Sequence, residues 1–279
     1  MVAPALVKQL RDQTGVGMTK CKEALEKTDG NMEEAVAFLR KAGLTSASKK
    51  EGRSTKEGMV AFHETNDTVA IVEVDAETDF VVKNEKFQEF CATLAQELAL
   101  VKTNSLDEFL QQPYSKDAQL NIDQLRSLLI QTIGENIQIR RILCIPKNEN
   151  ESIGIYSHMG GKILSVVVIN GVDQQVLARH VAMHAAATAP QYLCPEEVPQ
   201  ETVRQEEEIA REQIKGKPEH IIEQILQGKL RSFYEMICLV KQKYIRDDSL
   251  SVEEFVAKEG KESGQDLRVT RFLRWVAGQ

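Results

Sequence analysis

Apolar residues in the first part of the chain recur every three or four positions, which is the spacing of one face of an α-helix. Three such runs occur before residue 44, and glycine-containing turn sequences separate them. Arg40 and Lys41 end the third run and Gly43 follows them, an order typical of a helix C-terminus. The pattern predicts three short helices that end at Gly43, with apolar faces at Leu6, Val7 and Leu10, at Cys21, Ala24 and Leu25, and at Met32, Ala35, Val36 and Leu39.

Residues 45–56 interrupt this periodicity with a run of Ser, Thr, Lys, Glu, Gly and Arg that contains one alanine and no larger apolar residue. Such a composition is typical of a polar linker. We therefore expect a three-helix module at residues 1–44, resembling the ubiquitin-associated fold, and a linker at residues 45–56.

A strand–turn–strand–helix order follows the linker and occurs twice. A later helix at Leu125–Gly134 and a strand at Asn136–Ile145 add to the first copy. The sequence predicts an α+β protein with two related subdomains, each a small antiparallel sheet with helices on one side. The first copy has strands at Gly58–His63 and Thr68–Val74 and a helix marked by Phe87, Phe90, Cys91, Leu94 and Leu98; the second has strands at Gly154–His158 and Ile163–Ile169 and a helix at Asp173–Ala189.

Residues 199–231 differ from their surroundings because they are highly charged with a sparse apolar seam. The turn at Gly216-Lys-Pro218 predicts a projecting helical hairpin. An apolar seam on an isolated hairpin would be half covered, so we expect residues 199–231 to pair with a second copy in a homodimer. The expected boundaries are 57–145 for the first subdomain and 146–198 with 232–279 for the second, where Tyr234–Tyr244 and Leu267–Trp275 are compatible with strands.

Charge and cysteine content exclude several classes of protein. The net charge is −7, which argues against a general nucleic-acid-binding protein. The five cysteines are odd in number and widely spaced, without a C-x-x-C pair, so neither a zinc site nor a disulfide framework is indicated. The N-terminal residues lack the pattern of a signal peptide and no apolar run is long enough to span a membrane, so we expect a cytoplasmic protein without membrane contact.

An apolar strand ending at Val74 runs into Asp75-Ala-Glu-Thr-Asp-Phe-Val81, which places Thr78, Asp79 and Phe80 where a helix begins. Thr and Asp are favoured there because their oxygens accept first-turn N–H groups and an acid complements the helix dipole. One interpretation is a capped helix with a locally packed Phe80. The other is a rigid corner that presents an acid and an aromatic ring to another molecule.

The Thr78-Asp-Phe-Val81 segment resembles the signature of the elongation factor Ts family. The N-terminal block from Thr14 to Leu25, with Gly30-Asn31 and Leu39–Gly43, is similar to the N-terminal module of that family. The resemblance extends to Gly134–Arg141, where Glu135 and Arg140 are expected to hold the first subdomain together. Members of this family exchange the nucleotide of the GTPase elongation factor Tu.

The resemblance implies a translation elongation factor that binds elongation factor Tu with GDP and promotes GDP release by displacing Mg²⁺. It assigns Mg²⁺ displacement to Thr78, Asp79, Phe80 and Val81, and other contacts with the GTPase to Arg11, Met18, Cys21 and His158. Thr19 and Leu164 depart from residues frequent in the family, at a contact position and in the His158 hairpin. No cofactor and no catalytic residues are implied.

Two alternatives belong to other classes of protein. A ubiquitin-binding or scaffold adaptor would use the three-helix module alone. A metal-dependent hydrolase would use His180 and His184, which stand four residues apart on a predicted helix. The Glu of an H-E-x-x-H motif is absent between them, so packed structural histidines are favoured. The chain has no phosphate-binding P-loop, which suits a protein that acts on the nucleotide site of another.

Overall fold

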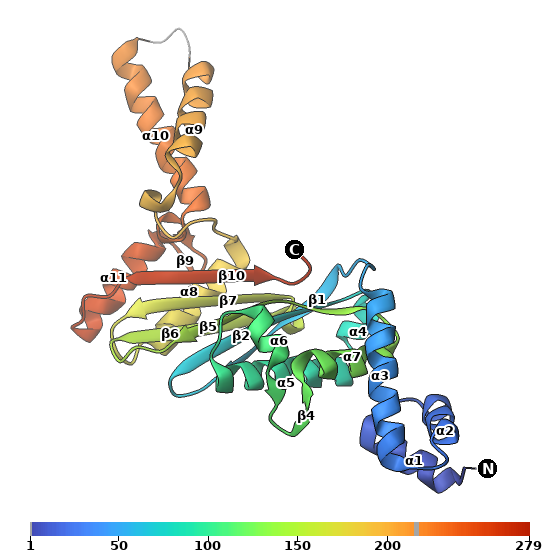
Figure 1. The fold of residues 1–279 in the computed structure, drawn as a ribbon. Coiled ribbons are helices and arrows are strands. Elements are labelled where there is room, and N and C mark those ends of the chain that lie inside the picture. Colours follow the sequence, from blue (N-terminus) through green and yellow to red (C-terminus); the bar gives the residue numbers. More distant parts are fainter. Residues whose placement is uncertain (1, 215–217) are drawn as a thin grey trace. The chain divides into compact units, whose positions relative to one another are not determined.

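The computed structural model describes residues 2–214 and 218–279, and the chain divides into two compact units (Figure 1). Each unit contains one three-stranded sheet with helices packed against it, which confirms the α+β class. The first unit comprises Met1–Pro146, Gly160–Lys162 and Val276–Gln279, and the second comprises Lys147–Met159 and Ile163–Trp275.

The N-terminal part of the first unit consists of three helices around a small apolar core. Gly15, with φ +70°, ends the first helix, and Asn31 caps the third by accepting the backbone N–H groups of Glu33 and Glu34. These helices are α1 (Pro4–Thr14), α2 (Met18–Lys27) and α3 (Met32–Lys50), and their core contains Val7, Leu10, Val16, Cys21, Ala24, Leu25, Ala35 and Leu39.

Helix α3 corrects one expectation, because it continues through Gly43 to Lys50. Gly43 and Ala47 are buried, and a Cβ at Gly43 would touch Ser127 and Leu128 of helix α7 (Ile122–Ile133). The glycine therefore lies at a helix–helix contact rather than at a helix end. The linker expected at residues 45–56 was wrong for residues 45–50, which continue α3 and bury Ala47.

The first subdomain is built on an antiparallel sheet in the order β1-β2-β5. Every residue of the central strand β2 is buried, and α5 packs on β1 and β2. The elements are β1 (Glu57–Glu64), β2 (Thr68–Ala76), α4 (Asp79–Val82), α5 (Glu85–Val101), α6 (Leu106–Gln111), β3 (Pro113–Tyr114), β4 (Asp117–Asn121), α7 and β5 (Ile137–Pro146).

The second unit repeats this plan, with strand order β10-β7-β6 and with α8 packed on β6 and β7. Its elements are β6 (Glu151–His158), the 3-10 turn η1 (Met159–Gly161), β7 (Ile163–Asn170), α8 (Gln175–Thr188), η2 (Pro195–Glu197), α9 (Gln200–Gln213), α10 (Glu219–Ile237), η3 (Leu239–Lys241), β8 (Lys243–Tyr244), β9 (Asp247–Ser251), α11 (Val252–Ser263) and β10 (Val269–Val276).

A hairpin and helix recur in the two units with the same register. Tyr114 pairs with Asp117 in β3–β4, and Tyr244 pairs with Asp247 in β8–β9. Each hairpin leads into a helix with a capping box, at Asn121 and at Ser251. The helices end at Gly134 and Gly264, both with positive φ, and every pair is 130 residues apart in the chain. This correspondence supports two related subdomains.

Helices α9 and α10 form the predicted hairpin, although its turn at Gly216-Lys-Pro218 lies partly outside the described residues. Ala210, Leu226 and Leu230 are buried against each other, with Val203 and Tyr234 beside them. Part of the seam is therefore covered within one chain, although Ile209 stays 53% exposed, which weakens the reason given for a homodimer. Helix α10 also runs to Ile237, so the expected strand at Tyr234–Tyr244 is limited to β8, whereas Leu267–Trp275 largely coincides with β10.

Candidate functional site

The Asp79–Phe80 corner follows strand β2 in the first unit. Thr78 has extended backbone angles, φ −131° and ψ 157°, and the four-residue helix α4 begins immediately after it. Phe80 is 80% exposed although it is one of the largest apolar residues. The sequence expectation of an exposed aromatic ring at this corner is therefore confirmed, and a ring packed into its own subdomain is excluded.

Val81 differs from Phe80, because only 5% of it is exposed. It packs in the core that also contains Phe87 and Phe90 of α5. The Val81 side chain therefore offers little surface to a partner in the free protein, and the contact that the resemblance implied stays a prediction. Val81 instead anchors the short helix that carries Phe80.

Thr78 was expected to cap α4 with its side chain, and the structure shows a different partner. No side-chain cap bond forms, and the Thr78 hydroxyl donates to Glu135 at 2.9 Å from Oε1 and 3.2 Å from Oε2. The backbone N–H of Thr78 donates to Glu135 Oε2 at 3.1 Å. One carboxylate thus holds the residue before the corner by both its side chain and its backbone.

The carboxylate of Glu77, the residue before Thr78, accepts a hydrogen bond from Asn136, the residue after Glu135. Glu77 Oε1 accepts the backbone N–H of Asn136 at 2.6 Å and lies 3.4 Å from the guanidinium of Arg53. Asn136 is fully buried, and its amide donates to the carbonyl oxygens of Arg53 at 2.9 Å and Glu51 at 3.4 Å. The corner is therefore hydrogen-bonded to the start of β5 and to the chain that leaves α3.

Asp79 is exposed and forms an ion pair with Lys83 at 2.6 Å, one turn later in the chain. The hydrogen bond from Lys83 lowers the pKa of Asp79 below its usual value. The carboxylate is consequently ionised at neutral pH and stands beside the exposed ring of Phe80.

In the three-helix module, Arg11 and Met18 are exposed and Cys21 is not. Met18 is 43% exposed at the start of α2. The Cys21 thiol is completely buried, donates to the carbonyl oxygen of Val16 at 3.2 Å, and has a pKa raised by burial. Cys21 is a core residue, so its side chain offers no exposed surface for the expected contact in the free protein, and that contact stays a prediction.

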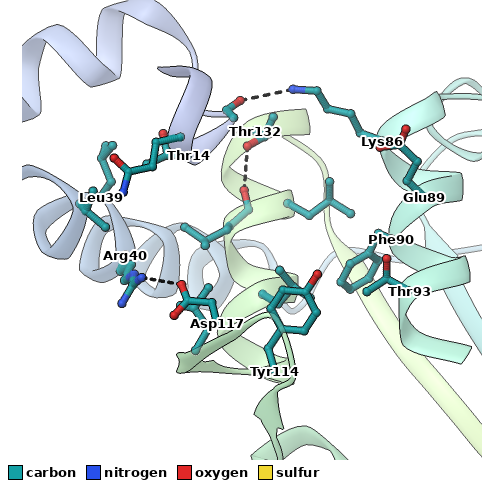
Figure 2. Close-up of a pocket in the computed structure, with 17 residues that line it drawn as sticks. Thr14, Leu39, Arg40, Lys86, Glu89, Phe90, Thr93, Tyr114, Asp117 and Thr132 are labelled. Carbon is teal, nitrogen blue, oxygen red and sulfur yellow. Dashed lines mark hydrogen bonds and ion pairs between the residues drawn. The ribbon is translucent and has the colours of Figure 1, made fainter. Parts of the chain in front are cut away.

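A cavity of about 480 Å³ lies between the module and the first subdomain (Figure 2). Arg40 spans it by bonding to Asp117 at 2.9 Å and to Gln119 at 3.1 Å. Lys86 donates to the carbonyl oxygen of Gly15 at 3.4 Å. These polar bonds, together with the packing of α3 on α7, hold the module against the subdomain within the first unit.

His158 lies at the end of β6 in the second unit and is exposed. Its ring stacks on Tyr156 with centroids 5.9 Å apart, and its Nδ1 lies 3.3 Å from the Tyr156 hydroxyl. Met159, the next residue, is 73% exposed with φ +51°. The hairpin therefore presents an imidazole and a thioether side by side to solvent.

His184 is a structural residue of the second unit. It is completely buried, with Nε2 3.0 Å from Gln242 Oε1 and Nδ1 3.3 Å from the backbone N–H of Ile245. This network assigns the neutral tautomer with the proton on Nε2. Burial lowers the pKa of His184, which keeps it neutral. His180 instead lies 3.3 Å from Arg246, so the two histidines do not share a ligand.

Within residues 2–214 and 218–279, no cluster of three or more His, Cys, Asp or Glu side chains could hold a metal ion. No helix in that part of the chain is long and apolar enough to cross a membrane.

The roles of Glu77, Lys83 and Asn136 at the corner were not predicted from the sequence. Lys83 could have been found, because an acid four residues before a lysine forms an ion pair on a helix. The bonds of Glu77 and Asn136 join segments far apart in the chain, and no local pattern indicates them.

Comparison with known proteins gives a consistent family. The sequence model described as Elongation factor TS matches residues 77–279. Elongation factor Ts of Protochlamydia amoebophila is 57% identical over 279 residues, covering 100% of this chain and 99% of the relative. The proteins of the same name from Chlamydia felis and Chlamydia muridarum are 45% and 44% identical over 273 residues, covering 98% of this chain and 97% of each relative. This chain therefore belongs to the elongation factor Ts family and is a translation elongation factor.

Proposed function

We propose that this protein binds elongation factor Tu in its GDP state and accelerates GDP release, so that GTP can bind. The single observation that carries the proposal is the exposed Phe80 beside the ionised Asp79 on a corner fixed from both sides. An aromatic ring exposed to this extent has little to contribute to the stability of its own fold. The free energy gained by burying the ring is therefore available for binding a partner.

The mechanism is a difference in affinity for two states of the GTPase. Such proteins hold GDP through backbone N–H groups, a lysine and a Mg²⁺ ion that bridges phosphate and switch residues. A factor that binds the open, Mg²⁺-free state more tightly than the closed state weakens GDP binding by the same factor, because coupling between two ligands is reciprocal.

Phe80 provides the larger part of this difference. Burying a Phe side chain contributes about 1.5–3 kcal/mol, which corresponds to about one to two decades in affinity. The whole contribution favours GDP release if the receiving pocket exists only in the open state of the GTPase. Asp79 adds negative charge near the magnesium shell, which disfavours the closed coordination of the cation.

The other exposed residues supply docking area on the two units separately. Arg11 and Met18 belong to the module of the first unit, and His158 with Met159 to the β6–β7 hairpin of the second. Contacts of this kind orient the Phe80 corner and do not themselves distinguish open from closed GTPase. The protein acts as an exchange factor with no catalytic residue of its own. We place it in the cytoplasm, where translation occurs, and we do not propose a homodimer.

Release of fluorescently labelled GDP from elongation factor Tu tests the proposal. Substoichiometric amounts of this protein should accelerate release in the presence of excess unlabelled nucleotide, because each molecule acts repeatedly. No acceleration at equimolar concentration, with both proteins folded, would contradict the proposed function.

A further inference from the structure

Packing of its own side chain does little to set the direction of Phe80 in the free protein, since 80% of it is exposed. Its position depends on the backbone of α4. A helix of four residues has no stability of its own, because nucleation costs more than one turn returns. The direction of the ring is therefore determined by what holds the chain immediately before and after α4.

After Phe80, the chain is held by packing. Val81 is buried in the core of the first subdomain, and the side chain of Asn84 caps α5 by accepting the N–H of Lys86 at 3.0 Å. These contacts fix the end of α4. They do not restrict rotation about the backbone of Thr78, the residue immediately before α4.

Before Phe80, the chain is held by one carboxylate. Glu135 accepts hydrogen bonds from both donors of Thr78: the N–H at 3.1 Å, and the hydroxyl, whose single hydrogen lies between the two carboxylate oxygens at 2.9 and 3.2 Å. A carboxylate that binds a backbone and a side-chain donor of one residue restricts both its φ and its side-chain rotation, and bonds to a charged acceptor are stronger than neutral ones.

We infer that Glu135 is a positioning residue for nucleotide exchange: its carboxylate fixes Thr78 so that the following Phe80 meets its receiving pocket in the required direction. Glu135 does not contact the GTPase in this account and acts through Phe80. The reverse bond from Asn136 to Glu77 keeps the two segments in register, and the bonds from Asn136 to Glu51 and Arg53 tie them to the chain leaving α3. This inference rests on the proposed function.

The test compares Glu135→Gln and Thr78→Val with wild type in GDP release, measured over a range of factor concentrations. Glutamine keeps the length of the side chain but provides one acceptor oxygen in place of two, and valine removes the Thr78 hydroxyl at nearly constant shape. Each variant should lower the maximal release rate about three- to tenfold, with less than a twofold change in half-saturating concentration. A displaced Phe80 ring slows GDP release but does not weaken the binding of the two proteins. Thr78→Ser keeps the hydroxyl, so its maximal release rate should equal that of wild type.

A Phe80→Ala background separates positioning from a general structural effect. If Glu135 acts through the ring, Glu135→Gln should change the rate less than twofold once the ring is gone. The matched control is Glu108→Gln, since Glu108 accepts a 2.7 Å hydrogen bond from the Thr103 hydroxyl elsewhere in the same subdomain. That variant should leave the maximal rate unchanged.

Two outcomes would overturn the inference while wild type remains active: an unchanged maximal rate in both folded variants, or an equal loss with and without Phe80. Inactive wild-type protein would instead overturn the proposed function, so the two failures are distinguishable.

Discussion

Phe80 and Phe90 belong to the same subdomain and differ widely in exposure, at 80% and 6%. Phe80→Ala should leave the melting temperature almost unchanged and reduce GDP exchange about tenfold, because only the complex buries that ring. Phe90→Ala is the matched control and should cost about 3–5 kcal/mol of folding stability, as truncation of a core Phe does. A destabilised Phe80→Ala variant with normal specific activity would contradict the proposal that the GTPase buries Phe80 during exchange.

Asp75 gives the protein a pH-dependent stability. It is 3% exposed, lies beside the buried Glu73, and its Oδ1 has no hydrogen-bond partner among the described residues. Burial, with a smaller effect of Glu73, raises the pKa of Asp75 to about 6, partly offset by Arg140 and Lys162. The folded state therefore binds this proton more tightly than the unfolded state, whose pKa is 3.8. Stability from Asp75 is greatest below pH 4 and is lost as pH rises to about 6.

Asp75→Asn should remove this loss. At pH 8 the variant should be more stable than wild type by about 1–3 kcal/mol, since each pKa unit corresponds to about 1.4 kcal/mol. The advantage should disappear near pH 4, where Asp75 is protonated in the folded protein. Urea unfolding of both proteins between pH 4 and pH 8 measures the difference. A difference that does not vary with pH would show that Asp75 is not responsible.

Sequence reasoning at the level of residues succeeded where the chemistry is local. The structural role of His184 followed from its neighbours in the chain, whereas the exposure of Phe80 followed from the family resemblance, because the local pattern also allowed a packed ring. Cys21 and Val81 were assigned to contacts with a partner by resemblance, and the structure buries both. Position in a motif does not reveal burial, because burial depends on what other segments bring to the same place.

Strand β6 and helix α8 approach each other closely at Gly154, which has no Cβ. A Cβ at Gly154 of β6 would lie 2.0 Å from the backbone nitrogen of Arg179 and 2.1 Å from the carbonyl carbon of Ala178. Gly154→Ala should therefore separate strand from helix and destabilise the second unit by about 1–3 kcal/mol or more.

The control is Gly228→Ala in α10, where nothing lies within 4 Å of the added Cβ. That change should raise stability by about 0.5–1 kcal/mol, because alanine loses less conformational entropy in a helix. Thermal unfolding of the two variants checks both signs. A Gly154→Ala protein as stable as wild type would show that the close contact is not required.

Element ends were the least predictable part of the fold. Short apolar runs bounded by turn residues were sufficient to find β1, β2, β6 and β7, since such runs are recognised without knowledge of the partner strand. Gly43 was interpreted as a helix end, but its short side chain serves the packing of α3 on α7. Residues 234–237 were assigned to a strand and lie in α10, where Tyr234 completes the hairpin seam.

At the scale of the whole molecule, the module and the first subdomain share helix α3. A deletion of residues 2–50 removes the packing of α3 on α7 and the buried Ala47 from the core of the first subdomain, so it should lower the melting temperature and raise the half-saturating concentration in exchange. A deletion of residues 2–30 removes Arg11 and Met18 but retains α3. This shorter deletion should also raise the half-saturating concentration, with a smaller change in melting temperature.

Nucleotide exchange titrations and thermal unfolding of the two truncated proteins provide the measurements. Unchanged half-saturation after deletion of residues 2–30 would mean that Arg11 and Met18 have no docking role. Equal melting temperatures for the full chain and the longer deletion would mean that α3 contributes nothing to the first subdomain.

The matched β-hairpin and capped helix in the two units are what duplication of an ancestral gene segment leaves behind. The two copies have since diverged in opposite ways. The first keeps a short connection at residues 102–112 and carries the Phe80 corner after its second strand, while the second accepts the long insertion of α9 and α10 within residues 189–242. Because the register of β8–β9 matches that of β3–β4 despite this insertion, natural selection could lengthen or shorten the helical arm without redesigning the subdomain that carries Phe80.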